Sequence, residues 1–191
     1  MTESTEAVLF ATPKAWETWL KKHHKTAAGL WLRVAKKGSE VRSVSYAEAL
    51  DVALCYGWID AQKKPDSDHA WLQRFTPRRA KSIWSKVNRL KVAALIEAGR
   101  MQPAGLAEIE RAKADGRWEA AYDSPRTAEV PEDLAAALAD NLPAKEFFAT
   151  LNSANRYAIL WRVQTAKKPE TRARRIRQFV EMLERQEKLH P

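Results

Sequence analysis

The sequence offers little basis for disulfide bonds, metal centres or membrane spans. Its single cysteine, Cys55, cannot form an internal disulfide and lies between Leu54 and Tyr56, a setting typical of a small buried thiol. None of the four histidines has zinc-ligand spacing with the cysteine or with another histidine, so we expect no metal site. No uninterrupted apolar run approaches the ~20 residues of a transmembrane helix, so we expect no membrane insertion.

Signals for export and for common catalytic sites are also absent from the sequence. Residues 1–11 lack the basic and apolar segments of a secretory signal, which favours a cytoplasmic protein. There is no Walker loop, no glycine-rich dinucleotide turn and no Gly-x-Ser-x-Gly elbow. The sequence therefore predicts no cofactor, and it favours a protein that is not an enzyme without deciding the question.

Positive charge is abundant and unevenly distributed. The net charge is +9, and residues 69–96 contain no acidic side chain at all. A basic field of this kind favours an anionic partner. The basic side chains of the acid-free stretch are Arg74, Arg78, Arg79, Lys81, Lys86, Arg89 and Lys91.

Local signals in the first third of the chain predict alternating helices and strands. Pro13 suits the first position of a helix, and the apolar run Leu30–Ala35 is typical of a strand. Ser45 and Glu48 have the spacing of a capping box, which predicts a helix start. Gly57 should end that helix in the left-handed conformation.

The following segment predicts a β-hairpin and two helices. Residues 58–62 and 70–75 flank a polar turn, as the two arms of a hairpin do. Hydrophobic spacing then predicts one helix from about Ser82 to Gly99 and another from Pro103 to about Ala114.

The rest of the chain reads as a linker followed by helices. Residues 123–130 lack a clear period, and helices should begin near Pro131, Pro143, Ser153 and Pro169. We therefore predict an α+β protein. Residues 1–122 should form a domain in which a small antiparallel sheet packs against helices, and residues 131–191 an all-helical region.

Four short motifs carry a family resemblance. They are residues 53–60 (ALCYGWID), 74–79 (RFTPRR), 82–88 (SIWSKVN) and 99–105 (GRMQPAG). On these motifs the chain resembles the YdeI/OmpD-associated family, also labelled bacteriocin-protection or OmdA-domain proteins, from Phe10 to the C-terminal tail. The resemblance implies a bacterial protein of stress resistance or bacteriocin protection, but no particular reaction.

The sharpest candidate site lies around the hairpin and the helix expected after it. Backbone N–H groups at a helix start, together with guanidinium groups, form a common recipe for binding phosphate, sulfate or carboxylate. Asp60 is the candidate general base. If Ile59 faces the core, Asp60 should emerge on the sheet surface within reach of an arginine. The candidate ligand-binding residues are Arg74, Arg78, Arg79, Ser82, Ser85, Asn88, Trp58 and Trp84. The alternative is structural: the serines cap the helix, an arginine pairs with Asp60, and the tryptophans belong to the core.

Three functions remain open from the sequence. The leading hypothesis is a stress-resistance or bacteriocin-protection protein that binds an anionic small molecule or partner. The first alternative is nonspecific nucleic-acid binding by the basic helices, since no recognition motif is present. The second is an enzyme with Asp60 in a tryptophan-walled pocket. Nothing in the sequence sets the oligomeric state.

Overall fold

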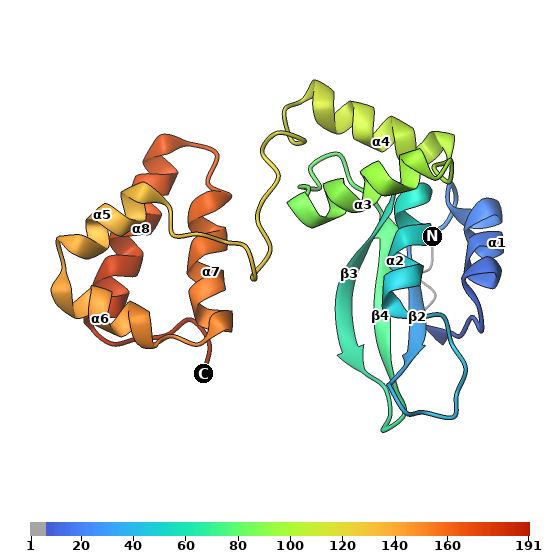
Figure 1. The fold of residues 1–191 in the computed structure, drawn as a ribbon, viewed down its shortest axis with the longest axis horizontal. Coiled ribbons are helices and arrows are strands. Elements are labelled where there is room, and N and C mark those ends of the chain that lie inside the picture. The colour runs from blue at the N-terminus through green and yellow to red at the C-terminus, as the bar shows by residue number, and fades with distance from the viewer. Residues whose placement is uncertain (1–6) are drawn as a thin grey trace. The chain divides into compact units, whose positions relative to one another are not determined.

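A computed structural model describes residues 7–191, which fall into two compact units (Figure 1). Unit 1 contains the chain up to Trp84 together with Asn88–Ala120, and unit 2 contains Ser85–Val87 and Ala121–Pro191. The described residues form eight helices and a four-stranded mixed sheet. The α+β class and the helical C-terminal part are thus confirmed.

The sheet of unit 1 has the strand order β1-β2-β4-β3. The strands are β1 (Ala7–Val8), β2 (Leu30–Ala35), β3 (Trp58–Pro65) and β4 (Ala70–Pro77). The expected hairpin is present as β3 and β4, and both strands run longer than the sequence suggested. One expectation needs correction: β1 pairs in parallel with β2, so the sheet is mixed. A two-residue strand carries too little periodicity to be found from sequence.

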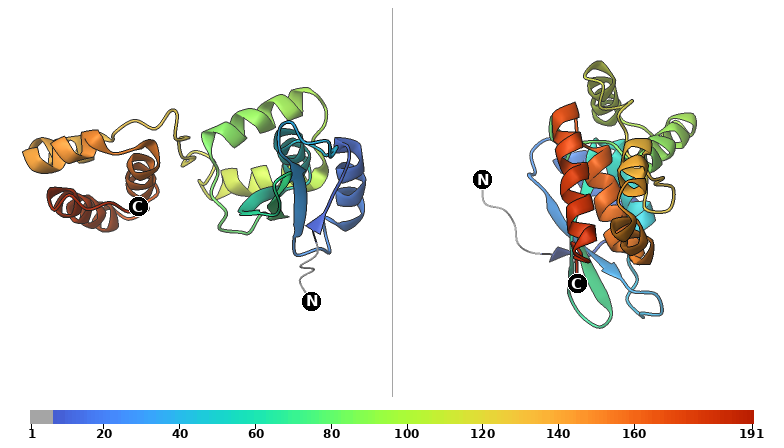
Figure 2. Two further views of the ribbon diagram at one scale, coloured as in Figure 1. Left: turned by 90° about the horizontal axis from the view of Figure 1, so that it is seen from below. Right: turned by 90° about the vertical axis from the view of Figure 1, so that its left-hand side faces the viewer.

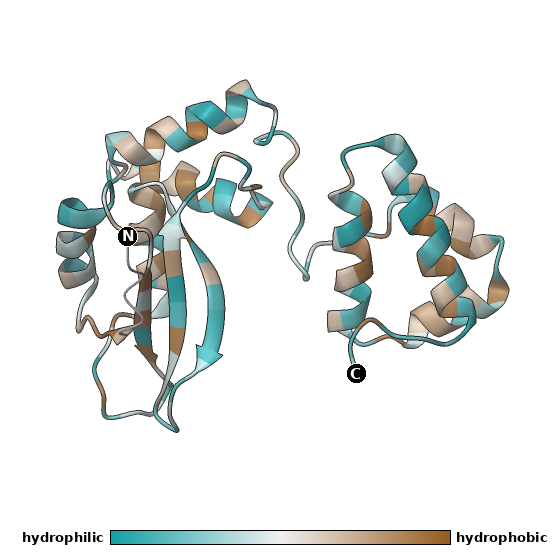
Figure 3. Cartoon of the chain, turned by 180° about the vertical axis from the view of Figure 1, so that it is seen from behind, coloured by the Kyte–Doolittle hydropathy of each residue, from teal (hydrophilic) through white to brown (hydrophobic). Residues whose placement is uncertain are grey.

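Helices cover one face of this sheet. Phe75 of β4 is fully buried there, with its ring centroid 5.6 Å from that of Trp16 in α1. Tyr46 of α2 lies over the same face, 5.9 Å from the ring of Trp71. Seen from behind in Figure 3, no helix of the described residues lies over the opposite face, and the edge strand β3 is the most hydrophilic of the long strands.

The helices of unit 1 begin and end at the local signals that the sequence contains. They are α1 (Pro13–His23), α2 (Tyr46–Cys55), α3 (Lys86–Glu97, whose first two residues group with unit 2) and α4 (Pro103–Ala114). Ser45 and Glu48 form both hydrogen bonds of the capping box, and Gly57 ends α2 with a φ of 73°. These ends depend on hydrogen bonds between near neighbours, which explains why they were predictable.

The start of α3 differs from the expectation. The helix begins at Lys86 and not near Ser82. Ser85, just before it, forms an isolated parallel bridge with Tyr122, which requires extended backbone. Arg78 stacks on Trp84, with its guanidinium carbon 3.6 Å from the ring centroid. Long-range contacts therefore hold the residues before Lys86 in a non-helical path.

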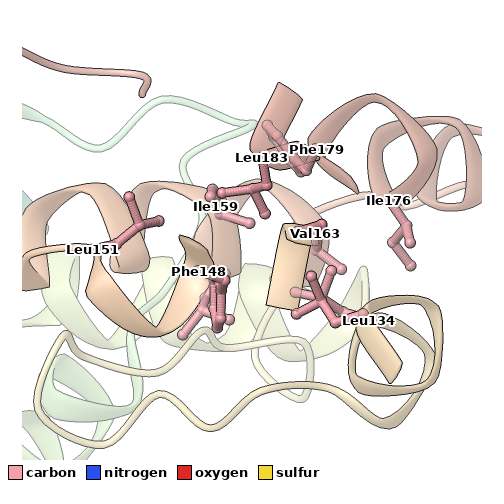
Figure 4. Packing of buried hydrophobic residues seen from close by; sticks show 11 residues of the cluster. Leu134, Phe148, Leu151, Ile159, Val163, Ile176, Phe179 and Leu183 are labelled. Atoms are coloured by element: carbon pink, nitrogen blue, oxygen red, sulfur yellow. The ribbon is translucent and has the colours of Figure 1, made fainter. Parts of the chain in front are cut away.

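Unit 2 is a cluster of four helices around an apolar core. The helices are α5 (Glu132–Ala139), α6 (Leu142–Thr150), α7 (Ser153–Gln164) and α8 (Pro169–Glu184). Figure 2 shows α7 and α8 side by side, and Figure 4 shows Ile159 of α7 next to Leu183 of α8, and Val163 of α7 next to Leu134 of α5. These helices begin within one residue of the expected Pro131, Pro143, Ser153 and Pro169, and the side chain of Asn152 caps α7. None of the helices in residues 7–191 is both long and apolar enough to cross a membrane.

Polar anchors fix the ends of unit 2. The buried side chain of Asn155 accepts from the backbone N–H of His190 and donates to its carbonyl, so the C-terminal tail is tied to α7. At the other end, Asp123 binds the Lys86 ammonium at 2.8 Å and accepts from the Gln164 amide. Burial raises the pKa of Asp123, but these two donors outweigh it and lower the pKa below its usual value.

Replacement of Gly105 by Ala should destabilise unit 1. A Cβ there would overlap the carbonyl oxygen of Cys55 and lie 2.8 Å from that of Leu54, and backbone atoms cannot give way cheaply. Alanine normally stabilises a helix, yet we expect a loss of about 2–3 kcal/mol in the free energy of unfolding. Urea denaturation of the full chain measures it. As control, Gly99→Ala meets open space and should cost only about 1 kcal/mol from its positive φ; equal losses would contradict the argument.

The ion pair between Asp133 and Arg172 should give unit 2 a pH-dependent stability. Hydrogen bonds from the Arg172 guanidinium hold the pKa of Asp133 below its usual value. A lowered folded-state pKa means that the stabilisation is present above the unfolded-state pKa and is lost as pH falls through the folded-state pKa. Because both side chains are partly exposed, Asp133→Asn should cost only about 0.5–1 kcal/mol at neutral pH.

This difference should disappear in acid, and amide hydrogen exchange in α8 is the measurement. Asp140→Asn is the matched control, because it removes an exposed carboxylate just after α5 that forms no ion pair with any residue in 7–191, and it should leave exchange in α8 unchanged. A loss for Asp133→Asn that persists unchanged at low pH would mean that the pair does not supply the stabilisation.

Candidate functional site

Unit 1 has a cavity of about 610 Å³ at the start of β3, the end of β4 and the loop that follows. Its lining includes Asp60, Arg74, Arg79 and Ser82, four residues that the sequence analysis singled out. Gln62 and Thr76 add an amide and a hydroxyl. The cavity is thus lined by hydrogen-bonding groups of both kinds, with two cations and one carboxylate.

A β-bulge shapes the edge of this cavity. The register between β3 and β4 shifts between Asp60 and Lys63, so Gln62 lies in the irregular stretch. Gln73 of β4, only 3% exposed, turns its side chain to this stretch and donates to the Gln62 carbonyl at 3.1 Å. The amide of Gln73 therefore stabilises the bulge, a role that a polar residue within an apolar strand could have signalled.

Asp60 is half-buried and accepts a hydrogen bond from the Tyr46 hydroxyl at 2.8 Å. The expected ion pair between Asp60 and an arginine is not formed among residues 7–191, although Arg74 and Arg79 line the same cavity. The reason is the orientation of β3. Trp58 faces the core and is 1% exposed, whereas Ile59 lines the cavity, the reverse of the arrangement considered from sequence. Because alternate residues share a face, Asp60 points to the helix side, where α2 begins.

The two arginines that line the cavity differ in their surroundings. The Arg74 guanidinium lies 5.7 Å from the Trp31 ring centroid, on the face without helices. Arg79 is exposed, and its side chain forms no ion pair with any residue in 7–191. Its backbone N–H donates to the Ser82 hydroxyl oxygen at 2.9 Å, which leaves the hydroxyl hydrogen able to donate into the cavity.

Two buried arginines hold the loop that carries Arg79 and Ser82. Arg78, 6% exposed, donates to the Ile83 carbonyl at 3.3 Å while it stacks on Trp84. Arg117, also 6% exposed, donates to the Ser82 carbonyl at 2.7 Å and binds Asp115. Consecutive carbonyls of the loop thus receive two guanidinium groups. Sequence reasoning missed Arg117, because it lies 35 residues from Ser82.

The remaining predicted residues lie outside the cavity. Trp58 and Trp84 are buried in the core of unit 1, and Trp58 donates to the His24 carbonyl at 3.1 Å. Ser85 groups with unit 2, and Asn88 lies in the first turns of α3. The cavity therefore has no tryptophan wall, and its donors come from a loop and two strands instead of a helix start.

The reactive groups of unit 1 and the cavity lining bear on what chemistry this part of the chain could do. Burial raises the pKa of the Cys55 thiol to about 11, so this cysteine stays protonated and is no nucleophile at neutral pH. The described residues contain no group of three or more His, Cys, Asp or Glu side chains that could hold a metal ion. Guanidinium and hydroxyl donors beside one carboxylate suit an anion that also presents a donor to Asp60.

Two family descriptions match the chain. Residues 8–108, more than half of its length, match the family described as "Domain of unknown function (DUF8412)". The chain belongs to that family. Residues 127–186 match the family described as "Bacteriocin-protection, YdeI or OmpD-Associated" (OmdA).

The two matches cover different parts of the chain, so they bear differently on the family resemblance described from the sequence motifs. The OmdA match confirms it for the C-terminal part only, which forms the helices of unit 2. The four motifs and the whole cavity precede that match, and the cavity lies within the DUF8412 match. No curated protein and no solved structure matches the chain.

Arg117 should act on the cavity through the position of Ser82. Arg117→Met removes the donors to the Ser82 carbonyl and leaves Asp115 without this partner, so unit 1 should lose about 1–3 kcal/mol. Amide hydrogen exchange should accelerate selectively from Arg79 to Trp84. Arg111→Met on exposed α4 is the control, because it loses only a surface pair with Glu108. Unchanged exchange in that loop would contradict the positioning role.

Proposed function

We propose that this protein binds a small anion in the unit 1 cavity, and that it serves bacterial stress resistance or bacteriocin protection in the cytoplasm. The observation that carries the proposal is the convergence of Arg74, Arg79 and the Ser82 hydroxyl on one cavity of about 610 Å³. The OmdA match of unit 2 supports the biological setting.

The lining restricts the ligand. The described lining holds two guanidinium groups and one carboxylate, and this modest excess of positive charge suits a singly charged group such as a carboxylate more than a condensed phosphate. Arginine presents paired donors in a planar fork, and this geometry fits a carboxylate or phosphate edge. Asp60, which already accepts from Tyr46, has remaining lone pairs for a hydroxyl or ammonium group of the ligand.

Neither alternative function has equal support. For an enzyme, the Tyr46–Asp60 pair at the cavity could move a proton, but neither cavity hydroxyl, of Ser82 or Thr76, is hydrogen-bonded to a base among residues 7–191 that could activate it. For a nucleic-acid protein, positive charge alone predicts only salt-sensitive affinity without sequence preference. The nucleic-acid alternative can be tested in the same binding experiment.

The experiment is a titration of the full chain with acetate, glycolate and inorganic phosphate, followed by amide NMR shifts at Gln62, Thr76 and Ser82. Arg79→Gln should weaken binding about tenfold or more, because it removes charge-assisted hydrogen bonds. The affinity of Arg79→Lys should lie between those of the unchanged protein and Arg79→Gln, since lysine keeps the charge but lacks the paired donors of the guanidinium group. Lys81→Gln makes the same charge change in the same loop outside the cavity lining and should have little effect.

Equal weakening by Arg79→Gln and Lys81→Gln would sink the proposal, because only the diffuse field would then matter. Random duplex DNA that displaces the small anions, with equal sensitivity to both variants, would favour the nucleic-acid alternative.

A further inference from the structure

A second cavity of unit 1 lies at the other end of β3, where the sheet ends. It has a volume of about 640 Å³. Its lining comes from three strands and the turn after β2: Ala35, Lys36, Lys37, Lys63, Lys64, Pro65 and Trp71. Four of these seven residues are lysines and none is acidic, so its charge differs from that of the first cavity.

The lysine contacts differ between the two faces of the sheet. The Lys63 ammonium lies 4.2 Å from the ring centroid of Trp71 in the cavity lining, whereas the Lys64 ammonium lies 4.3 Å from that of Trp31, on the face without helices. Lys36 donates to the Ser67 carbonyl at 2.9 Å and so joins the end of β2 to the hairpin turn. The nearby carboxylate of Asp66 is already paired with Arg33. No acid of the lining therefore offsets the ammonium groups of Lys36, Lys37 and Lys63.

The floor and the rim differ in chemistry. Trp71, Pro65, Ala35 and the lysine methylenes present carbon, while the ammonium groups extend to water at the rim. The indole of Trp71 is half-buried, with Tyr46 near it on the helix side. Lys63 is exposed, and a cation–π contact at an exposed site is weak, so Lys63 can leave the Trp71 ring for an anion at little cost.

We propose that this cavity, here named the lysine cavity, binds a small aromatic anion. The ring of the ligand packs against Trp71 and Pro65, and its anionic group takes the ammonium groups of Lys63 and Lys36 or Lys37. An inorganic anion would use the rim alone, and a neutral aromatic would use the floor alone. Binding by both parts together distinguishes this site from a solvated basic surface, which is the usual role of lysines on an edge strand.

The test compares three probes on the full chain: naphthalenesulfonate, which has both parts, sulfate, which has only the charge, and neutral naphthol, which has only the ring. Amide NMR shifts at Lys37, Lys63 and Trp71 give the affinities. Naphthalenesulfonate should bind about tenfold or more tightly than either partial probe, because it uses apolar burial and ion pairing at once.

Variants separate the two parts of the lysine cavity. Lys37→Gln with Lys63→Gln should reduce naphthalenesulfonate affinity to that of naphthol, and Trp71→Leu should reduce it to that of sulfate. Lys21→Gln with Lys22→Gln, on exposed α1, is the charge-matched control and should change nothing. Arg79→Gln should also leave this binding intact, so failure here is distinguishable from failure of the first proposal.

Two results would overturn the inference. One is equal affinity for sulfate and naphthalenesulfonate, which would leave only a diffuse basic field. The other is unchanged naphthalenesulfonate affinity in the double lysine variant. Because both lysines are exposed, that variant should fold and remain informative even if Trp71→Leu does not.

Discussion

The packing of α1 against β4 through Phe75 is the constraint on which unit 1 depends. Phe75 has no solvent exposure, and Trp16 and Trp58 belong to the same aromatic cluster. Once Phe75 faces the helices, strand alternation assigns every other side chain of β4 to a face. Arg74 and Thr76 must then lie on the face without helices, and that places them in the first cavity.

The same constraint explains why Asp60 accepts a hydrogen bond from the hydroxyl group of Tyr46. Asp60 pairs in register with Phe75, so it shares the helix-covered face, where Tyr46 begins α2. The bulge after Asp60 then breaks the alternation, and the Gln73 side chain stabilises this break. Neighbouring side chains of β3 that a regular strand would place on opposite faces of the sheet therefore line the same cavity. The buried guanidinium groups of Arg78 and Arg117 complete it by fixing the loop beyond β4.

The two proposed sites of unit 1 differ in what charge and carbon each offers. The first has guanidinium forks, hydroxyls and a carboxylate, and it suits a small polar anion. The lysine cavity has point charges above an apolar floor, and it suits an anion with a ring. Tyr46 contacts both, through its hydroxyl at Asp60 and its ring at Trp71. Unit 2 has its own core around Ile159 and Leu183 and carries the OmdA match.

Sequence alone determined the elements whose ends depend on neighbouring residues. The capping box at Ser45, the left-handed stop at Gly57 and the strand Leu30–Ala35 were all found where the structure has them, because each involves residues a few positions apart. It also selected Asp60, Arg74, Arg79 and Ser82, which the fold brings to one cavity. Tertiary structure alone decided the rest. Tyr46 as the partner of Asp60, Arg117 as the support of Ser82, the delayed start of α3 and the lysine cavity all depend on contacts across tens of residues. Such contacts leave no local periodicity in the chain, and only the packed core around Phe75 fixes which faces meet.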